Sequence, residues 1–182
     1  MRSIAVIILI IYLSAAFMQP MIETANICKE KVVLGAAILN SCRAASKRAL
    51  SEDELRDLDA KIDPKNFADY FAEAFGDTLS ITQDGPSIVS GETVSMSFST
   101  TDERWDKIDI VLEFQNMVDI DSYSSYTLFD HYDLGYNAAI LDIYLTTPYV
   151  FRTYFLKKAI GALTISDYNL TEKRQFVVRV LN

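Results

Sequence analysis

The sequence predicts an α+β fold in which N-terminal helices are followed by a long antiparallel β region. Apolar residues recur every three or four positions up to Gly76, as they do on one face of a helix. From Leu79 onward they alternate with polar residues, which is typical of half-buried strands. Turn sequences such as Asp84-Gly85-Pro86 separate the alternating runs. With about seven strands expected, the pattern favours an antiparallel sandwich or a strongly curved sheet.

The first 16 residues have the order of a secretory signal peptide. Arg2 supplies positive charge, Ile4–Leu13 are almost entirely apolar, and Ser14-Ala15-Ala16 offer a small-residue cleavage site. The apolar run is about a dozen residues, shorter than the ~20 that cross a membrane, so we expect cleavage rather than a membrane span. The sequence therefore predicts a secreted, extracellular protein, with a helical segment over residues 17–76 and an antiparallel β domain over 77–182.

The charge of the chain limits its partners. The formal net charge is −8, and without Arg2 it becomes −9, from 16 basic and 25 acidic residues. Nucleic acid is a poor partner for so acidic a surface. We therefore expect an extracellular protein or glycan as partner, and no nucleic acid.

Residues 27–49 predict a helix whose apolar stripe carries both cysteines, Cys28 and Cys42. On a continuous helix their Cα atoms are about 21 Å apart, whereas a disulfide needs less than ~7 Å. Three interpretations follow: two small buried side chains, an internal disulfide if the helix breaks near Gly35 or Asn40, or a parallel homodimer bridged at both positions. The whole stripe consists of Cys28, Val32, Gly35, Leu39, Cys42, Ala45 and Ala49.

Two further helix starts are recognisable. Ser51-Glu52-Asp53-Glu54 is a capping box, so a short helix is expected from Glu52. Asp63-Pro64 places a cap and a first helical residue before an aromatic stripe, and Gly76 is expected to end this helix. We interpret the stripe as a face packed on the sheet, with a pocket lining as the alternative. It consists of Phe67, Tyr70, Phe71, Ala74 and Phe75.

The β region shows its clearest alternation in two runs. Val94, Met96 and Phe98 alternate with small polar residues, and the run from Ile108 to Phe114 does the same with charged ones. Further strands are expected at 126–134, 138–146, 149–156, 163–168 and 176–181.

Two stretches resemble the strands of a known domain type. Ser90-Gly91-Glu92-Thr93-Val94-Ser95-Met96-Ser97-Phe98 and the run Leu170–Val180 are similar to the opening and last strands of secreted immunoglobulin-like domains. The resemblance is to the N-terminal domain of the Ser/Thr-rich, GPI-anchored fungal cell-wall family. It implies an immunoglobulin-like β-sandwich outside the cell. The helical N-terminal third departs from that family.

The order of helices first and strands afterwards also resembles a second fold. In nuclear-transport-factor-2-like (NTF2-like) domains, N-terminal helices pack inside a cone made by a curved antiparallel sheet. This alternative resemblance implies an interior pocket for a small molecule.

The candidate chemistry centres on the single histidine. If its strand alternates, His131 and Asp133 share a face, and a carboxylate beside an imidazole suits a general base. A solvated, polar strand end explains the same residues, and we favour that interpretation. We expect no metal and no cofactor, because one histidine disfavours a zinc site and nothing fixes the geometry of a calcium site. The calcium candidates are Asp119, Asp121, Asp130 and Asp133.

Asn169-Leu170-Thr171 has the sequence of an N-glycosylation acceptor and falls between predicted strands. Together with the secretion signal, it predicts a secreted glycoprotein. We found no nucleophile elbow, phosphate-binding loop or Cys-x-x-Cys motif. The leading hypothesis is a non-enzymatic binding or structural module outside the cell. The alternative is an NTF2-like pocket protein, an isomerase or lyase that uses His131.

Overall fold

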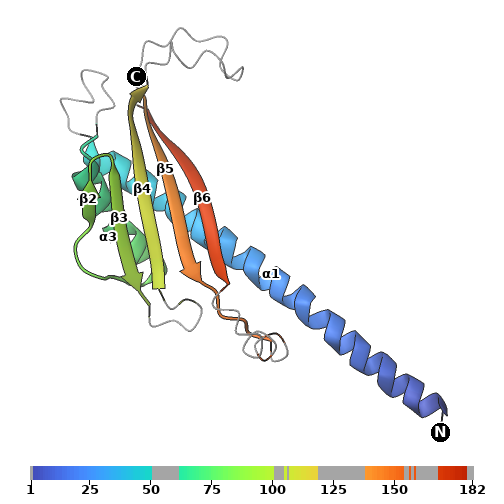
Figure 1. The fold of residues 1–182 in the computed structure, drawn as a ribbon. Coiled ribbons are helices and arrows are strands. Elements are labelled where there is room, and N and C mark those ends of the chain that lie inside the picture. The colour runs from blue at the N-terminus through green and yellow to red at the C-terminus, as the bar shows by residue number, and fades with distance from the viewer. Residues whose placement is uncertain are drawn as a thin grey trace, which may run out of the picture.

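Among the residues that the structure describes, two helices lie on one face of an antiparallel sheet (Figure 1). This arrangement confirms the α+β class. The protein is described by a computed structural model, which covers residues 2–50, 62–100, 105, 107–118, 138–153, 156, 158 and 168–179.

Helix α1 spans Arg2–Ala49 and is 48 residues long. The helix expected over residues 27–49 is confirmed, but it begins far earlier, at Arg2. Its second half crosses behind the sheet, whereas its first half extends away from the rest of the protein (Figure 1). Pro20 lies inside the helix. The helix shows no break at Gly35 or Asn40.

The buried stripe of α1 differs from the predicted one. Cys42 and Ala45 are fully buried, but Cys28 is exposed and Val32 is 69% exposed. The prediction was wrong at these two positions because the inward face of the N-terminal part includes two carboxylates, which an apolar count omits. The observed stripe consists of Glu23, Glu30, Leu34, Gly35, Ala37, Ile38, Ser41, Cys42 and Ala45.

Helix α3 spans Pro64–Leu79 and begins as predicted, with Asp63 as its cap. The Asp63 carboxylate accepts a hydrogen bond from the Lys65 backbone N–H at 3.2 Å. The expectation that Gly76 ends the helix is wrong, because the helix continues to Leu79 and Ser80 closes it in the left-handed region at φ 55°. The Ser80 N–H donates to the Gly76 carbonyl, as does the Ile81 N–H at 3.0 Å.

Phe67 and Phe75 of the predicted α3 stripe face the sheet, as expected, whereas Tyr70 lies against Arg48 of α1. The Phe67 ring meets Phe114 edge-on at 5.5 Å between centroids, and Phe75 lies 5.1 Å from Phe98. Phe71 stacks on Phe75 at 5.6 Å. These rings fill the space between α3 and the sheet.

The described part of the chain contributes six strands to the sheet: β1, β3, β4, β5 and β6 are neighbours in that order, and β2 also pairs with β3. All pairings are antiparallel. The strands are β1 (Thr82–Gln83), β2 (Ile88–Ser90), β3 (Thr93–Ser99), β4 (Lys107–Val118), β5 (Ala138–Pro148) and β6 (Asn169–Arg179).

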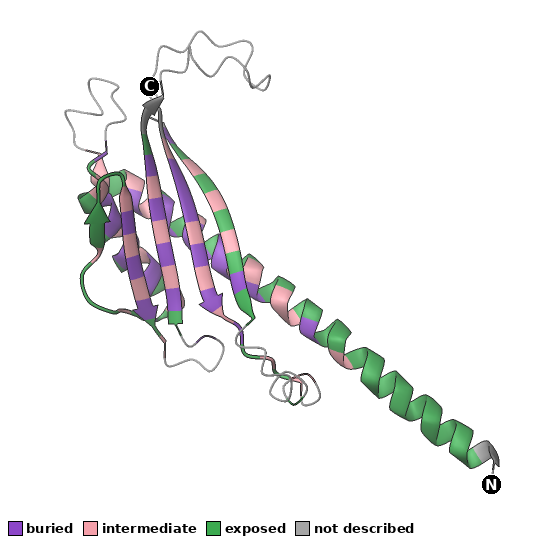
Figure 2. Ribbon diagram, viewed as in Figure 1, coloured by how far each residue is buried: buried purple, intermediate pink, exposed green. Residues whose placement is uncertain are grey.

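One face of the sheet forms the core together with both helices (Figure 2). Phe98 pairs with Ile108, and Leu112 pairs with Ile143, so their side chains share the inward face. The predicted sandwich is not confirmed, since the described strands form one sheet that is not closed and α1 and α3 cover its core face. Alternation in a sequence shows that one face of a strand is buried, but not what covers it.

Several predicted elements can be compared directly. The strand expected at 138–146 is confirmed as β5, and most of the one expected at 176–181 lies in β6. A strand over 149–156 is not found among its described residues: Tyr149 makes only an isolated bridge to Trp105, and residues 150–153 are not in a strand. The capping-box helix from Glu52, the strand at 126–134 and nearly all of 163–168 lie outside the described residues.

We expect Gly76→Ala to destabilise the protein by about 1–2 kcal/mol, although alanine favours a helix interior by up to ~1 kcal/mol over glycine. A Cβ at this position would lie 2.9 Å from the Ile81 carbonyl oxygen. This oxygen belongs to the backbone, which cannot move aside as easily as the end of a side chain. The measurement is the free energy of unfolding by chemical denaturation.

Gly35→Ala is the matched control in the other helix. A Cβ there would meet Arg174 Nη2 at 2.7 Å, but this is the end of a flexible side chain that can move aside. We expect its unfolding free energy to change by less than about 1 kcal/mol. If Gly76→Ala were as stable as the parent protein, our account of the α3 end would be wrong.

Candidate functional site

The first half of α1 is apolar and has no contact that buries it. Residues Ile4–Ile22 include no charged side chain. All of them are exposed except Gln19, which is half-buried, and the large apolar side chains are between 44% and 73% exposed (Figure 2). Since the exposed apolar side chains lie all around the helix, this is not an amphipathic helix with one buried face.

The length of this segment matches a membrane. The helical stretch from Ile4 to Ile22 is about 28 Å long, close to the ~30 Å of a bilayer core. α1 is the one helix among the described residues that is long and apolar enough to cross a membrane, and a signal sequence would meet the same criteria. The predicted cleavage site at Ser14-Ala15-Ala16 lies inside the continuous helix. Cleavage there stays a prediction.

The exposed segment ends at a buried carboxylate. Glu23 is only 2% exposed and accepts three hydrogen bonds from the chain that follows β5. Tyr149 Oη and the Arg152 backbone N–H each donate to Glu23 Oε1 at 2.9 Å. The Thr153 backbone N–H donates to Oε2 at 3.2 Å. We call Glu23 and these three donors the carboxylate clamp.

A second carboxylate lies two turns further along the same face of α1. Glu30 is also 2% exposed, and its Oε1 pairs with the Arg152 guanidinium at 2.8 Å. Glu30 Oε2 has no hydrogen-bond partner among the described residues. Two carboxylates thus share one arginine, so the side chain of Arg152 and the backbone around it are held from two positions on α1.

The clamp changes the titration of its phenol. Burial, together with the hydrogen bond to the Glu23 carboxylate, raises the pKa of Tyr149 well above its usual range. The neutral phenol is the form that can donate to a carboxylate, so the folded state favours the protonated tyrosine.

Three aromatic rings gather beside the clamp. Tyr149 meets Phe151 edge-on at 5.3 Å and Tyr168 edge-on at 6.2 Å between centroids. Phe151 and Tyr168 lie 5.8 Å apart. We call Tyr149, Val150, Phe151 and Tyr168 the aromatic end of the sheet, because they follow β5 and precede β6.

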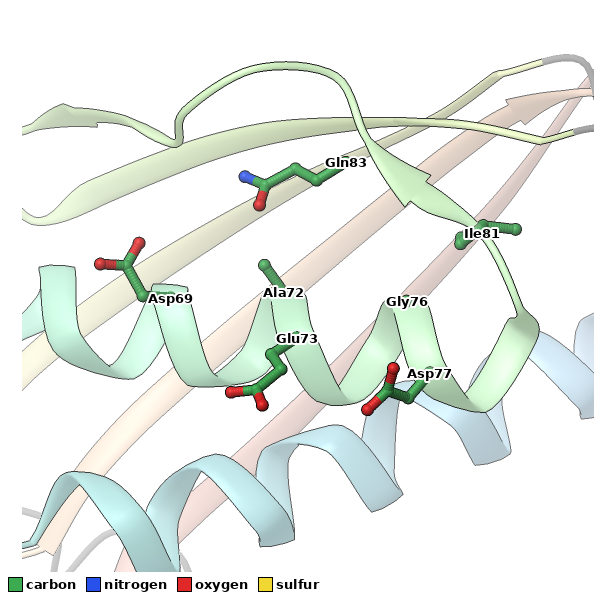
Figure 3. Close-up of a pocket in the computed structure, with 7 residues that line it drawn as sticks. All are labelled: Asp69, Ala72, Glu73, Gly76, Asp77, Ile81 and Gln83. Carbon is green, nitrogen blue, oxygen red and sulfur yellow. The ribbon is translucent and has the colours of Figure 1, made fainter.

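A second candidate is an open groove of about 430 Å³ between α3 and β1 (Figure 3). Carboxylates from successive turns of α3, Asp69, Glu73 and Asp77, line it together with Gln83. Glu73 is paired with Arg48 at 2.7 Å. Among the described residues there is no group of three or more His, Cys, Asp or Glu that could hold a metal ion. The groove is acidic, but nothing in it points to a ligand.

The predicted site residues are only partly described. His131, Asp133 and the calcium candidates Asp119, Asp121 and Asp130 lie outside the described residues, so the isomerase or lyase hypothesis stays a prediction. Asn169 is exposed at the start of β6 and pairs with Pro148.

Both cysteines are free in the structure, Cys28 exposed and Cys42 buried. The uninterrupted helix between them provides no break for an internal disulfide. A bridge from Cys42 to another chain would require this fully buried thiol to leave the core, whereas Cys28 remains accessible for an intermolecular bridge. Burial raises the pKa of the Cys42 thiol to about 12.

No protein-family model matches the chain, and comparisons with curated proteins and with solved structures found no significant match. The two fold resemblances of the sequence therefore receive no support from relatives.

The sequence reasoning missed the carboxylate clamp. A detectable signal was the spacing of Glu23, Ile27, Glu30 and Leu34, which places two acids on the same helix face as two apolar residues. The partners Tyr149 and Arg152 are more than 100 positions away, and no local pattern links them to α1.

We expect the free energy of unfolding to fall less steeply with rising pH in Tyr149→Phe than in the parent protein. The folded state holds the phenol pKa above the unfolded value of about 10, so its contribution is fully present below pH ~10 and is lost as the pH rises toward the folded pKa. The measurement is the free energy of unfolding of both proteins between pH 8 and about pH 11.

At pH 8 the variant should be less stable by about 1–3 kcal/mol, because Glu23 loses a donor. All other ionisable groups are the same in the two proteins, so the difference between the two curves reports Tyr149 alone. Parallel curves would contradict the role given to this hydrogen bond.

We expect one thiol per chain to react with a maleimide or disulfide reagent in the folded protein, and two after denaturation. Cys28 is exposed, whereas Cys42 is buried and its raised pKa keeps it protonated. Cys28→Ser is the control and should leave no rapidly reacting thiol. Two fast thiols in the folded protein would contradict the burial of Cys42.

Proposed function

We propose that this chain is a membrane-anchored, extracytoplasmic α+β domain that acts as a binding or structural module, not as an enzyme. The first half of α1 spans the bilayer, and the sheet with its two helices is held outside the cell. The observation that carries the proposal is the run Ile4–Ile22, which is uncharged and exposed around the whole helix. Bilayer is the environment in which such a surface is stable.

The polar residues of this segment fit a bilayer. The Ser14 hydroxyl donates to the Ile10 carbonyl at 2.8 Å, so its polar group is satisfied within the helix. Pro20 lies near the end of the segment, and the Thr24 hydroxyl donates to the Pro20 carbonyl at 2.8 Å. The first charged residue after the segment, Glu23, is shielded by its own hydrogen bonds.

Retention of the helix avoids the exposed apolar end that cleavage would leave on the mature protein. A cut after Ala16 would produce a mature end with Phe17 and Met21 exposed by 72% and 73%. Such an apolar stub on a secreted protein is costly in water. In a retained helix the same side chains contact lipid.

A non-enzymatic role is supported by the use of the buried charged groups. Glu23 and Glu30 are occupied in holding Arg152 and its neighbours. The acidic surface and the position outside the membrane suit a partner that is an extracellular protein or a glycan.

We expect the chain expressed in a bacterial host to keep residues before Phe17 by intact mass, and to remain in the membrane after alkaline carbonate extraction. A membrane-impermeant maleimide added from outside should label Cys28, which is the exposed thiol. A mature mass beginning at Phe17 with release into the medium would overturn the anchor and support secretion instead. Labelling only after the membrane is broken would reverse the orientation.

A matched pair of substitutions in α1 tests the span directly. Ile11 and Val32 are 63% and 69% exposed, so arginine fits at either position without disturbing the core. Ile11→Arg places a charge near the bilayer centre, at a cost of about 2.5–3.5 kcal/mol, and should lower the membrane-integrated fraction several-fold. Val32→Arg should leave it unchanged. An equal effect of both variants would contradict the proposal.

A further inference from the structure

The carboxylate clamp holds the aromatic end of the sheet beside Glu23 of α1. Glu23 is the residue directly after the apolar run, and its carboxylate binds Tyr149, Arg152 and Thr153. The chain after β5 therefore lies beside the point where α1 leaves the domain, at the end of the sheet nearest the exposed helix (Figure 1). The turn between β2 and β3 lies at the opposite end of the sheet.

The aromatic end of the sheet exposes apolar side chains to solvent. Val150 is 42% exposed and Tyr168 is 45% exposed, and Phe151 is half-buried between them and Tyr149. The one charged side chain within residues 149–153 is Arg152, which is tied to Glu30. The exposed Val150 and Tyr168, together with Phe151, form a small apolar surface at this end of the sheet.

These side chains are those that favour the membrane–water interface. Tyrosine rings are enriched there because one edge is apolar and the hydroxyl remains in the polar layer. Arginine suits the same layer, where phosphate groups accept its hydrogen bonds. A protein partner would also cover apolar surface, but the hydrogen bonds to Glu23 place this surface at the end of the proposed span, where lipid headgroups are already present.

We propose that the aromatic end of the sheet rests in the lipid headgroup layer through its exposed side chains, Val150 and Tyr168, with Phe151 packed beside them, and is a second membrane contact beside α1. This inference rests on the proposed function, because it needs the first half of α1 in the bilayer. The domain is then held at two points, the helix and the sheet end, and cannot swing freely about α1.

The test uses the full chain in phosphatidylcholine vesicles with a small fluorophore on a single engineered cysteine. Val150→Cys is compared with Val89→Cys, which lies in β2 near the opposite end of the sheet and is equally exposed, 43% against 42%. Both variants carry Cys28→Ser, and Cys42 stays buried and unlabelled. The quencher is a nitroxide on the lipid headgroup, and flotation with the vesicles is recorded for the same samples.

We expect the headgroup nitroxide to quench the Val150 label at least about twofold more than the Val89 label. Equal quenching in chains that float with the vesicles would overturn the membrane contact and leave the anchor standing. A Val150 label shielded from both the nitroxide and an aqueous quencher would indicate a protein partner and would also overturn it. Chains that do not float would refute the anchor, and with it this inference.

Discussion

The length of α1 is the constraint on which the rest of the structure depends. A helix of 48 residues is about 72 Å long, whereas strands of 11 or 12 residues cover only about 36–40 Å. The sheet cannot cover such a helix, so part of it must lie outside the core. The excess is not a polar extension but the apolar run Ile4–Ile22. The sequence thus divides one helix between two environments, and the boundary falls at Glu23.

Buried carboxylates at this boundary do what apolar side chains cannot. A hydrophobic contact between α1 and the sheet end would tolerate sliding or rotation, since burial has no direction. The hydrogen bonds to Glu23 and the ion pair from Glu30 to Arg152 have fixed geometry and set the register of the helix. Such pairs add little net stability compared with apolar packing, so their contribution here is orientation. A fixed orientation matters for a domain held at a membrane.

The sequence predicted local structure better than it predicted layers. Alternation located β3, β4 and β5 because each strand is half-buried, and Asp63-Pro64 located the start of α3 because capping is a local interaction. The predicted second sheet is not confirmed, and alternation could not decide it because a helix and a second sheet bury a strand face equally well. The predicted apolar run in α1 ended before Ser14, because the sequence does not show that this hydroxyl is hydrogen-bonded within the helix. Glu23 and Glu30 were left out of the predicted buried face, because a buried carboxylate is not recognisable without its partner.

The Glu23 carboxylate also explains why the described residues after Pro148 do not continue as a strand. Apolar and aromatic residues from Tyr149 onward have the composition of a strand, and a longer β5 would need their backbone N–H groups for pairing. Glu23 instead accepts the N–H groups of Arg152 and Thr153, and the chain turns toward α1. One side chain therefore ends the sheet and places its aromatic end beside the apolar half of the helix. The end of the sheet, the register of α1 and the proposed membrane contact thus all depend on the same long-range hydrogen bonds to Glu23.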